Sequence, residues 1–222
     1  MPVRIGDATP SGFRFGDLTA TKIYLGDVLV FPAFTVVSQT FSTVGNWTFN
    51  IPAECGAIDI ILLGGGGGGS SGNGAIGTGS GGEGGQWEAI TLIRGIDFPF
   101  TATQITGVVG DGGTGGPGGW LPINGNPGNP TTASIAGVGT LEAAGGRGGG
   151  FFSGDRKGYA PVPQILNHNG INYTGGAATG DSAANGNPPG GGAGGGNSGF
   201  FGFPAGGGGK GARGQAWIRA YV

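Results

Sequence analysis

The residues that could carry catalytic chemistry are few and far apart in this sequence. His168 is the only histidine and Cys55 the only cysteine. A single histidine excludes a metal site with several histidine ligands, and a serine–histidine–aspartate triad would depend on it alone. Because Asn167 and Asn169 flank it, we expect His168 to lie in a solvated loop. We expect Cys55 to be a small buried hydrophobic residue and not a reactive thiol.

The acidic residues show no pair suited to hydrolysis of a glycosidic bond. A depolymerase of that kind needs two carboxyl groups on either side of the scissile bond. Glu83 and Glu88 flank a turn into a strand, while Asp155 and Asp181 each stand alone in glycine-rich segments. The sequence therefore does not support a depolymerase.

Two glycine-rich matches to nucleotide-binding motifs fail in their surroundings. Residues 64–69 contain Gly-x-Gly-x-x-Gly, but the dinucleotide-binding version requires a helix to begin there, and Ser70 opens a non-helical segment. Residues 206–210 approach a phosphate-binding loop, yet Gly211 replaces the magnesium-binding Ser or Thr and Pro204 replaces the first glycine. We expect no enzymatic activity, no cofactor and no metal site.

Charge and hydropathy exclude two further classes of partner. The formal net charge is −2, and ten Lys and Arg residues are spread singly, so no basic patch for nucleic acid or anionic membrane is formed. No apolar stretch approaches the roughly 20 residues of a membrane span, and no apolar signal segment follows Met1. We expect no nucleic-acid binding, no membrane insertion and no cleaved export signal.

Aromatic side chains in or beside the glycine-rich segments are the best candidates for contact with a partner. Exposed rings on loops can stack on sugars or anchor in a pocket. Alternatively they close the ends of the fold or fill an interface between identical subunits, which we favour for the Phe pairs at 151–152 and 200–201. Segment 151–174 is the longest without a glycine run. The candidate binding residues are Trp120, Phe151, Phe152, Arg156, Lys157, Tyr159, His168 and Tyr173.

Glycine runs dominate the elements that must position these residues. Fifty-nine of the 222 residues are glycine, with runs at 64–69, 112–119, 145–150 and 190–214. Glycine loses more conformational freedom on folding than other residues, so ordered runs need compensation. Only 10% of residues are charged and 36% are hydrophobic, which is unlike a disordered chain. We infer that glycine lets backbones pack against backbones.

A three-residue period within the runs predicts polyglycine-II helices. The clearest examples are Ser80, Glu83 and Gln86, and then Thr114, Pro117 and Trp120. Three residues per turn is the polyproline-II repeat, which would leave two mostly bare edges for hydrogen bonds between neighbouring helices. Valine at Gly115 or Gly116 should therefore force backbones apart, whereas Thr114 should tolerate it.

Strand-like segments complete an all-β fold in which we expect no α-helix. Residues 1–33 place the triplets IGD, FGD and LGD ten residues apart, which predicts short hairpins in a module too small to bury its own core. In residues 34–222 we expect strands within 34–63, 87–109, 132–144 and 215–222. These strands would form a β-sandwich-like mount for the glycine-rich helices.

The junctions between strands and glycine runs resemble those of a known family. They are GNWTFNIP at 45–52, DIILL at 59–63 before six glycines, GVVGDGG at 107–113, LEAAGGRGG at 141–149 and GARGQAWI at 211–218. Over nearly its whole length the chain resembles the glycine-rich domain of bacteriophage minor tail proteins, particularly those of long-tailed actinobacterial phages.

This resemblance implies a virion protein of the phage tail, assembled in the host cytoplasm. It would be a tail-tip or tail-fibre adhesin without catalysis that binds a receptor of the host cell envelope, a glycan being one class. Residues 1–33 would attach to other tail proteins, and loops 120–130, 151–174 and 197–205 would face the receptor. The alternative is a purely structural tail or capsid decoration protein.

The limited apolar content also predicts self-association. Few hydrophobic side chains must offset a large ordering cost, and contact between identical copies would bury more surface. We therefore expect a homo-oligomer, specifically a homotrimer.

Overall fold

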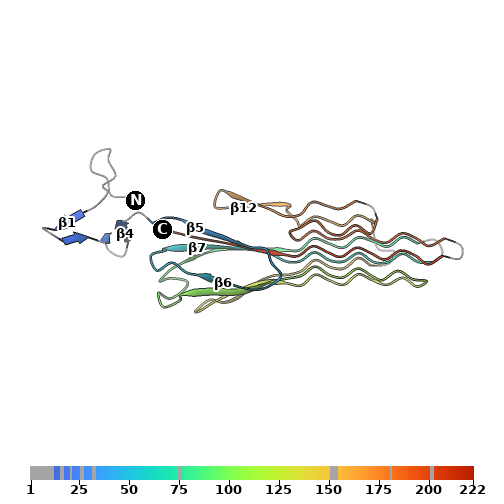
Figure 1. Cartoon of the computed structure of the whole chain (residues 1–222), viewed down its shortest axis with the longest axis horizontal. Helices are drawn as coiled ribbons and strands as arrows, with labels where there is room; N and C mark the ends of the chain where they lie inside the picture. Colours follow the sequence, from blue (N-terminus) through green and yellow to red (C-terminus); the bar gives the residue numbers. More distant parts are fainter. Residues whose placement is uncertain are drawn as a thin grey trace.

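The computed structural model shows an elongated protein with β-sheets at one end and a bundle of glycine tracts at the other (Figure 1). It describes residues 13–15, 18–20, 22–25, 28–31, 34–74, 77–150, 155–180, 182–200 and 203–222. All regular elements in these ranges are strands, so the prediction of an all-β fold is confirmed. None of the described residues belongs to a helix long and apolar enough to cross a membrane.

Two four-stranded antiparallel sheets form a sandwich. The first has the order β11 (Gly139–Ala143), β10 (Thr131–Ile135), β9 (Gln104–Val109) and β6 (Gly45–Asn50). The second has the order β5 (Val37–Phe41), β14 (Gln215–Tyr221), β7 (Ala57–Leu63) and β8 (Trp87–Ile93). The expected strand segments therefore contain these eight strands, apart from Thr131 at the start of β10.

The core lies between the two sheets. Strand β6 alternates buried Trp47 and Phe49 with exposed polar residues, as expected of a strand with one buried face. Strand β7 is buried on both faces. Ile60 packs in the core between the sheets, whereas the next residue, Ile61, faces away from that core. Cys55 is also buried in the core, and this burial raises the pKa of its thiol, as expected of an inert cysteine.

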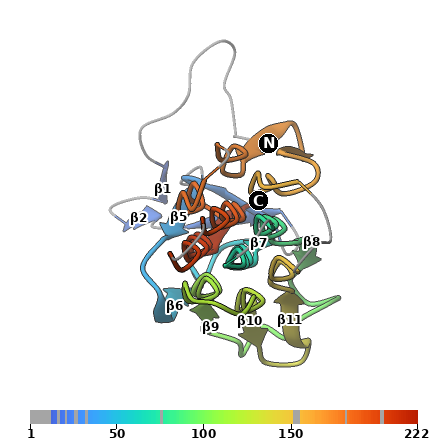
Figure 2. The same cartoon turned by 90° about the vertical axis from the view of Figure 1, so that its right-hand side faces the viewer.

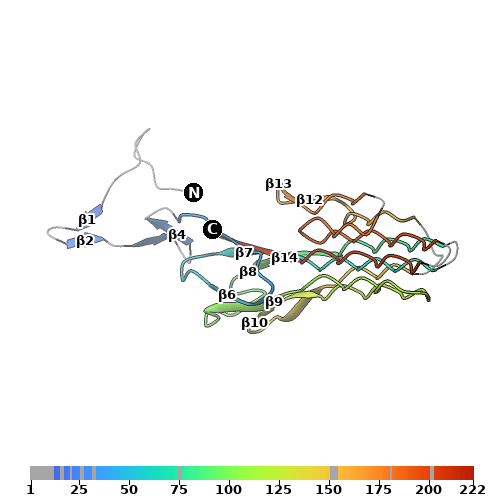
Figure 3. The same cartoon turned by 45° about the vertical axis from the view of Figure 1, so that its right-hand side comes forward.

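A hairpin forms a third layer over the outer face of the second sheet (Figure 3). It consists of β12 (Ile165–His168) and β13 (Ile171–Thr174). The expectation that residues 151–174 form a loop is wrong for this part. Asn169 and Gly170 both have positive φ, 49° and 76°, which is the geometry of a two-residue hairpin turn. The Asn-Gly pair was the sequence signal for this hairpin.

The glycine tracts pack around one central tract, residues 64–71. Viewed end-on, the tracts trace triangular coils (Figure 2). The N–H groups of Gly65, Gly66 and Gly67 donate to three different neighbours, at N···O distances of 3.0, 2.8 and 2.8 Å. The carbonyls of the same three residues accept from three other neighbours. The six neighbouring tracts are 79–86, 110–118, 123–130, 144–150, 190–197 and 205–214.

The same six partners recur three residues later along the central tract, from Gly68 to Ser70. This period satisfies every backbone N–H and C=O of residues 65–70, which are all buried. A three-residue period is what polyglycine-II helices would have, and the assignment of the tracts to that helix type stays a prediction.

Close approach of backbones explains why the central tract is glycine. A Cβ atom at Gly67 would lie 1.9 Å from the carbonyl oxygen of Arg147, and one at Gly66 would lie 2.0 Å from that of Gly191. Neither glycine has a positive φ, so the backbone conformation alone would accept other residues. The requirement is therefore for space.

The amino-terminal region contains two antiparallel hairpins. Strands β1 (Phe13–Phe15) and β2 (Leu18–Ala20) form the first, and β3 (Ile23–Leu25) and β4 (Val28–Phe31) form the second. The ten-residue repeat predicts hairpin turns at Gly-Asp pairs, and these turn residues lie outside the described ranges. The role of residues 1–33 in attachment stays a prediction.

Candidate functional site

Exposed apolar side chains gather at the end of the bundle away from the sheets. Trp120 and Leu121 lie in the turn after tract 110–118, and Phe200 and Phe203 lie in the segment after tract 190–197. These four residues, which we call the tip patch, are 61–75% exposed.

Backbone contacts hold the turns of the tip together. Gly119 pairs with Ala205 in a β-bridge, and the N–H of Gly74 donates to the carbonyl of Trp120 at 3.3 Å. The bundle behind them is filled by backbone, so large side chains have no core to enter there. Four such side chains at one end are typical of an interaction surface.

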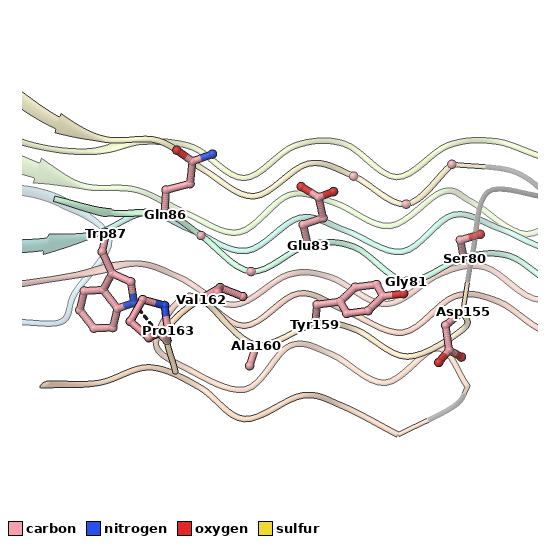
Figure 4. A pocket seen from close by; sticks show the side chains of 15 residues that line it. Ser80, Gly81, Glu83, Gln86, Trp87, Asp155, Tyr159, Ala160, Val162 and Pro163 are labelled. Atoms are coloured by element: carbon pink, nitrogen blue, oxygen red, sulfur yellow. Dashed lines mark hydrogen bonds between the residues drawn. The ribbon is translucent and has the colours of Figure 1, made fainter. Parts of the chain in front are cut away.

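A groove of about 790 Å³ runs along one side of the bundle (Figure 4). Tract 79–86 forms its floor, and residues 148–150 and 155–163 form its walls. The indole N–H of Trp87 donates to the carbonyl of Pro163 at 2.7 Å and closes one end. The side chains of the groove are those of Ser80, Glu83, Gln86, Trp87, Asp155, Tyr159, Ala160, Val162 and Pro163. We call it the tract groove.

The floor of the tract groove shows the three-residue period directly. Ser80, Glu83 and Gln86 project from the same side of their tract (Figure 4). The intervening Gly81 and Gly84 face the wall, where a Cβ would lie 1.8 Å from the Lys157 carbonyl oxygen and 2.3 Å from the Pro161 nitrogen, respectively. A polar row therefore alternates with bare backbone along the groove.

Two carboxylates that are distant in the sequence line the same tract groove. Glu83 lies on its floor and Asp155 on its wall, with the two side chains pointing away from each other (Figure 4), and the spacing of these residues in the chain did not indicate that they share a groove. Both residues are exposed, whereas the general acid of a glycosidase is held in a desolvating pocket. Among the described residues, no group of three His, Cys, Asp or Glu could hold a metal ion.

The predicted binding residues fall into separate places. Trp120 belongs to the tip patch and Tyr159 to the tract groove. The guanidinium of Arg156 donates to the side-chain oxygen of Asn197, and Lys157 beside it is exposed. Phe151 and Phe152 lie outside the described residues. The other two candidates lie on the third-layer hairpin.

Tyr173 and His168 are held against the second sheet. Tyr173 is 7% exposed, and its ring meets that of Trp217 edge-on at 5.5 Å, so the monomer does not present it as a free aromatic face. His168 is half-buried in β12, with Nε2 3.0 Å from the Thr91 hydroxyl and 3.6 Å from Asp59. The expectation of a solvated loop histidine is therefore wrong, because the hairpin folds back onto the sheet.

Sequence reasoning missed a buried polar cluster around Asp59. This carboxylate is completely buried and accepts hydrogen bonds from Thr91 (2.7 Å), Asn169 (2.9 Å) and Tyr221 (3.0 Å), while Arg219 lies 3.3 Å away. A buried charge needs such partners. Because both oxygens are engaged by the protein, the cluster fixes the hairpin to the sheet. The lone Asp in an otherwise apolar strand was the signal for it.

Comparisons with known proteins find similarity over most of the chain. The model of the glycine-rich domain family matches residues 41–221. The Gene 32 protein of Mycobacterium phage D29 is 46% identical over 203 residues, covering 90% of each chain. The Gene 32 protein of Mycobacterium phage L5 is 44% identical over 202 residues, covering 90% of this chain and 89% of that protein. The similarity therefore spans sheets and tracts together.

Proposed function

Because the chain belongs to the glycine-rich domain family and its relatives are mycobacteriophage proteins, we propose that this phage protein is a minor tail protein of the virion that binds the host cell surface without catalysis. The tip patch is the observation that carries the proposal. Its large apolar side chains are exposed. The end of the bundle that carries them is the end of the molecule farthest from the amino-terminal hairpins (Figure 1). A tail protein held at one end would present this surface to the host.

The opposite end offers a surface for a neighbour in the tail. Strand β8 ends at Ile93, away from the tracts, and the connection to β9 exposes Ile96 (78%) and Phe100 (67%). The Arg94 guanidinium lies 5.7 Å from the centre of the Phe100 ring and helps to hold this connection in place. Together with residues 1–33, this surface would attach the protein to other tail proteins.

A structural protein of the tail or capsid is the second candidate function. In that case the tip patch would be covered by another virion protein and would not meet the host. The dense hydrogen bonding of the tracts is compatible with either role. A cell-binding experiment therefore distinguishes the host-binding role from the structural role.

The test is a fluorescent-protein fusion of the full chain incubated with susceptible mycobacteria. We expect the parent protein to label the cells and the double variant Trp120→Ala, Phe203→Ala to bind about tenfold or more weakly. Ile96→Ala is the matched control, because it removes an equally exposed apolar side chain at the opposite end. Absence of labelling by the parent would favour the structural role, and full labelling by the double variant would exclude the tip patch.

We further propose that the protein associates as a homotrimer, which would multiply weak binding at single sites. Light scattering should give three times the monomer mass. The unfolding midpoint should rise with protein concentration, since association stabilises the folded state. A monomeric mass, with a midpoint unmoved by roughly hundredfold dilution, would contradict this proposal.

A further inference from the structure

We propose that the tract groove binds a linear polysaccharide that is neutral or carries amines. The inference rests on the proposed host-binding function for the source of its ligand. It concerns a different surface from the tip patch, because its residues lie along the side of the bundle. Its chemistry can therefore be tested separately.

The shape of the tract groove suits an extended repeating chain. Its volume of about 790 Å³ is within the usual range for ligand sites, roughly 300–1,000 Å³. At the polyproline-II rise, groups three residues apart are separated by about 9 Å. Ser80, Glu83 and Gln86 thus form a straight row at this spacing, in which Ser80 is buried and Glu83 and Gln86 are exposed to a ligand. A linear polymer with its own repeat can meet such a row at successive units.

The aromatic residues of the tract groove are rigidly supported. Tyr159 is 44% exposed, yet its N–H donates to the Gly82 carbonyl at 3.0 Å and its carbonyl accepts from Gly192 at 2.9 Å. The ring is thereby carried on a fixed backbone. Trp87 stacks on Trp217 at a centroid distance of 5.6 Å and so holds the end of the groove in place. Tyr and Trp rings have only two side-chain torsions, so on such a backbone they stack on sugar faces at little cost in conformational entropy.

The polar groups of the tract groove select the charge of the ligand. Among the described residues that line it, the only charged side chains are Glu83 and Asp155, both acidic. Carboxylates accept hydrogen bonds from hydroxyl groups and attract amines, while they repel sulfate and phosphate. Gln86 adds both a donor and an acceptor. The lining therefore favours neutral or amine-bearing sugars over polyanions.

The experiment titrates the full-length protein with oligosaccharides cut from the neutral wall polysaccharide of susceptible mycobacteria, with heparin as the polyanionic comparison. Calorimetry reports binding, as does the intrinsic fluorescence of the four tryptophans, one of which is Trp87. We expect saturable binding of the neutral oligosaccharides and none of heparin. Tyr159→Ala should weaken binding about tenfold, whereas Tyr159→Phe should stay within about threefold of the parent. Glu83→Gln should weaken it by a smaller factor.

Matched controls separate the tract groove from the rest of the surface. Tyr24→Ala removes another exposed tyrosine and Glu142→Gln another exposed carboxylate, and neither should change the affinity. Unchanged thermal unfolding shows that each variant is folded. The proposal is overturned if the folded parent binds no neutral oligosaccharide, if heparin binds better, or if Tyr159→Ala with Glu83→Gln binds like the parent.

Cell labelling makes the two proposals separable. Oligosaccharide binding by a protein that does not label cells would support the tract groove and contradict the adhesin role. Labelling of cells without oligosaccharide binding would overturn the tract-groove proposal and leave the adhesin role standing. Release of new reducing ends would support the ligand class and contradict the absence of catalysis.

Discussion

The β-sandwich and the glycine bundle are stabilised by opposite means. In the sandwich, large side chains such as Phe49, Ile60 and Ile105 fill the space between two sheets. In the bundle, the central tract has six neighbouring tracts and is held by backbone hydrogen bonds, with almost no side chains between the tracts. Removal of side-chain atoms should therefore lower the stability of the sandwich, because cavities form. Addition of side-chain atoms should lower the stability of the bundle, because the glycines of the central tract have no space for a Cβ.

The strongest test of this contrast adds one methyl group to the centre of the bundle. Gly67→Ala would place its Cβ 1.9 Å from the carbonyl oxygen of Arg147, so the tracts must separate and lose hydrogen bonds. We expect a loss of more than about 4 kcal/mol of unfolding free energy, at the extreme of single substitutions. Chemical denaturation measures it.

Gly180→Ala is the matched control for that change. It adds the same methyl group where nothing lies within 4 Å of the new Cβ, and Gly180 has no positive φ. Its effect should stay within about 0.5 kcal/mol. Equal effects at Gly67 and Gly180 would contradict backbone packing as the reason for glycine.

The converse test removes atoms from the sandwich. Phe49 is 1% exposed, and Phe49→Ala should cost about 3–5 kcal/mol of unfolding free energy because a cavity remains. The exposed Phe203 of the tip patch is the matched control, and Phe203→Ala should change stability by less than about 0.5 kcal/mol. A small effect at Phe49 would mean that the sandwich core contributes little to stability.

The third-layer hairpin depends on one buried charge. Asp59→Ala would leave Arg219 and three hydrogen-bond donors without their acceptor, which we expect to cost about 3 kcal/mol. Hydrogen exchange should increase first in β12 and β13, which the cluster attaches to the sheet. Faster exchange throughout the chain, without preference for this hairpin, would contradict the role assigned to Asp59.

The same region should lose stability in alkali. Burial raises the pKa of Tyr173, and burial followed by the hydrogen bond to Asp59 raises that of Tyr221, both above the ordinary value of 10.0. The folded state therefore holds these protons more tightly than the unfolded state. Their contribution is complete below about pH 10 and falls as the pH rises through the folded values. Tyr221→Phe should reduce this alkaline loss, measured as denaturation midpoints from pH 8 to 11.

The smallest expected effect is at an outward position of a tract. Thr114 is exposed, next to Gly115, whose Cβ would lie 2.0 Å from the Gly208 carbonyl oxygen. Thr114→Val should change the unfolding free energy by no more than about 0.5 kcal/mol, although it removes the hydrogen bond from Asn126. Gly115→Val and Gly116→Val should each be far more damaging. Similar losses at Thr114 and Gly116 would contradict the three-residue period.

Local patterns predicted much of the fold and little of the candidate sites. Alternation in β6, the apolar run of β7 and the spacing of Ser80, Glu83 and Gln86 all correspond to the observed elements. The hairpin at 165–174 was missed, although its Asn-Gly turn is a local signal. The burial of Tyr173 could not be foreseen, since it depends on Trp217, 44 residues away in the chain.

By itself, the sequence determined where the strands of the sandwich and most of the glycine tracts lie, because these follow from periods of two and three residues. Only the tertiary structure decided which tracts are neighbours. Glycine runs present nearly identical backbone edges to every partner, so they carry no side-chain code for pairing. Their arrangement depends on the positions and directions of the sandwich strands from which the tracts continue. That Glu83, Asp155 and Tyr159 line one groove is therefore a property of the assembled bundle.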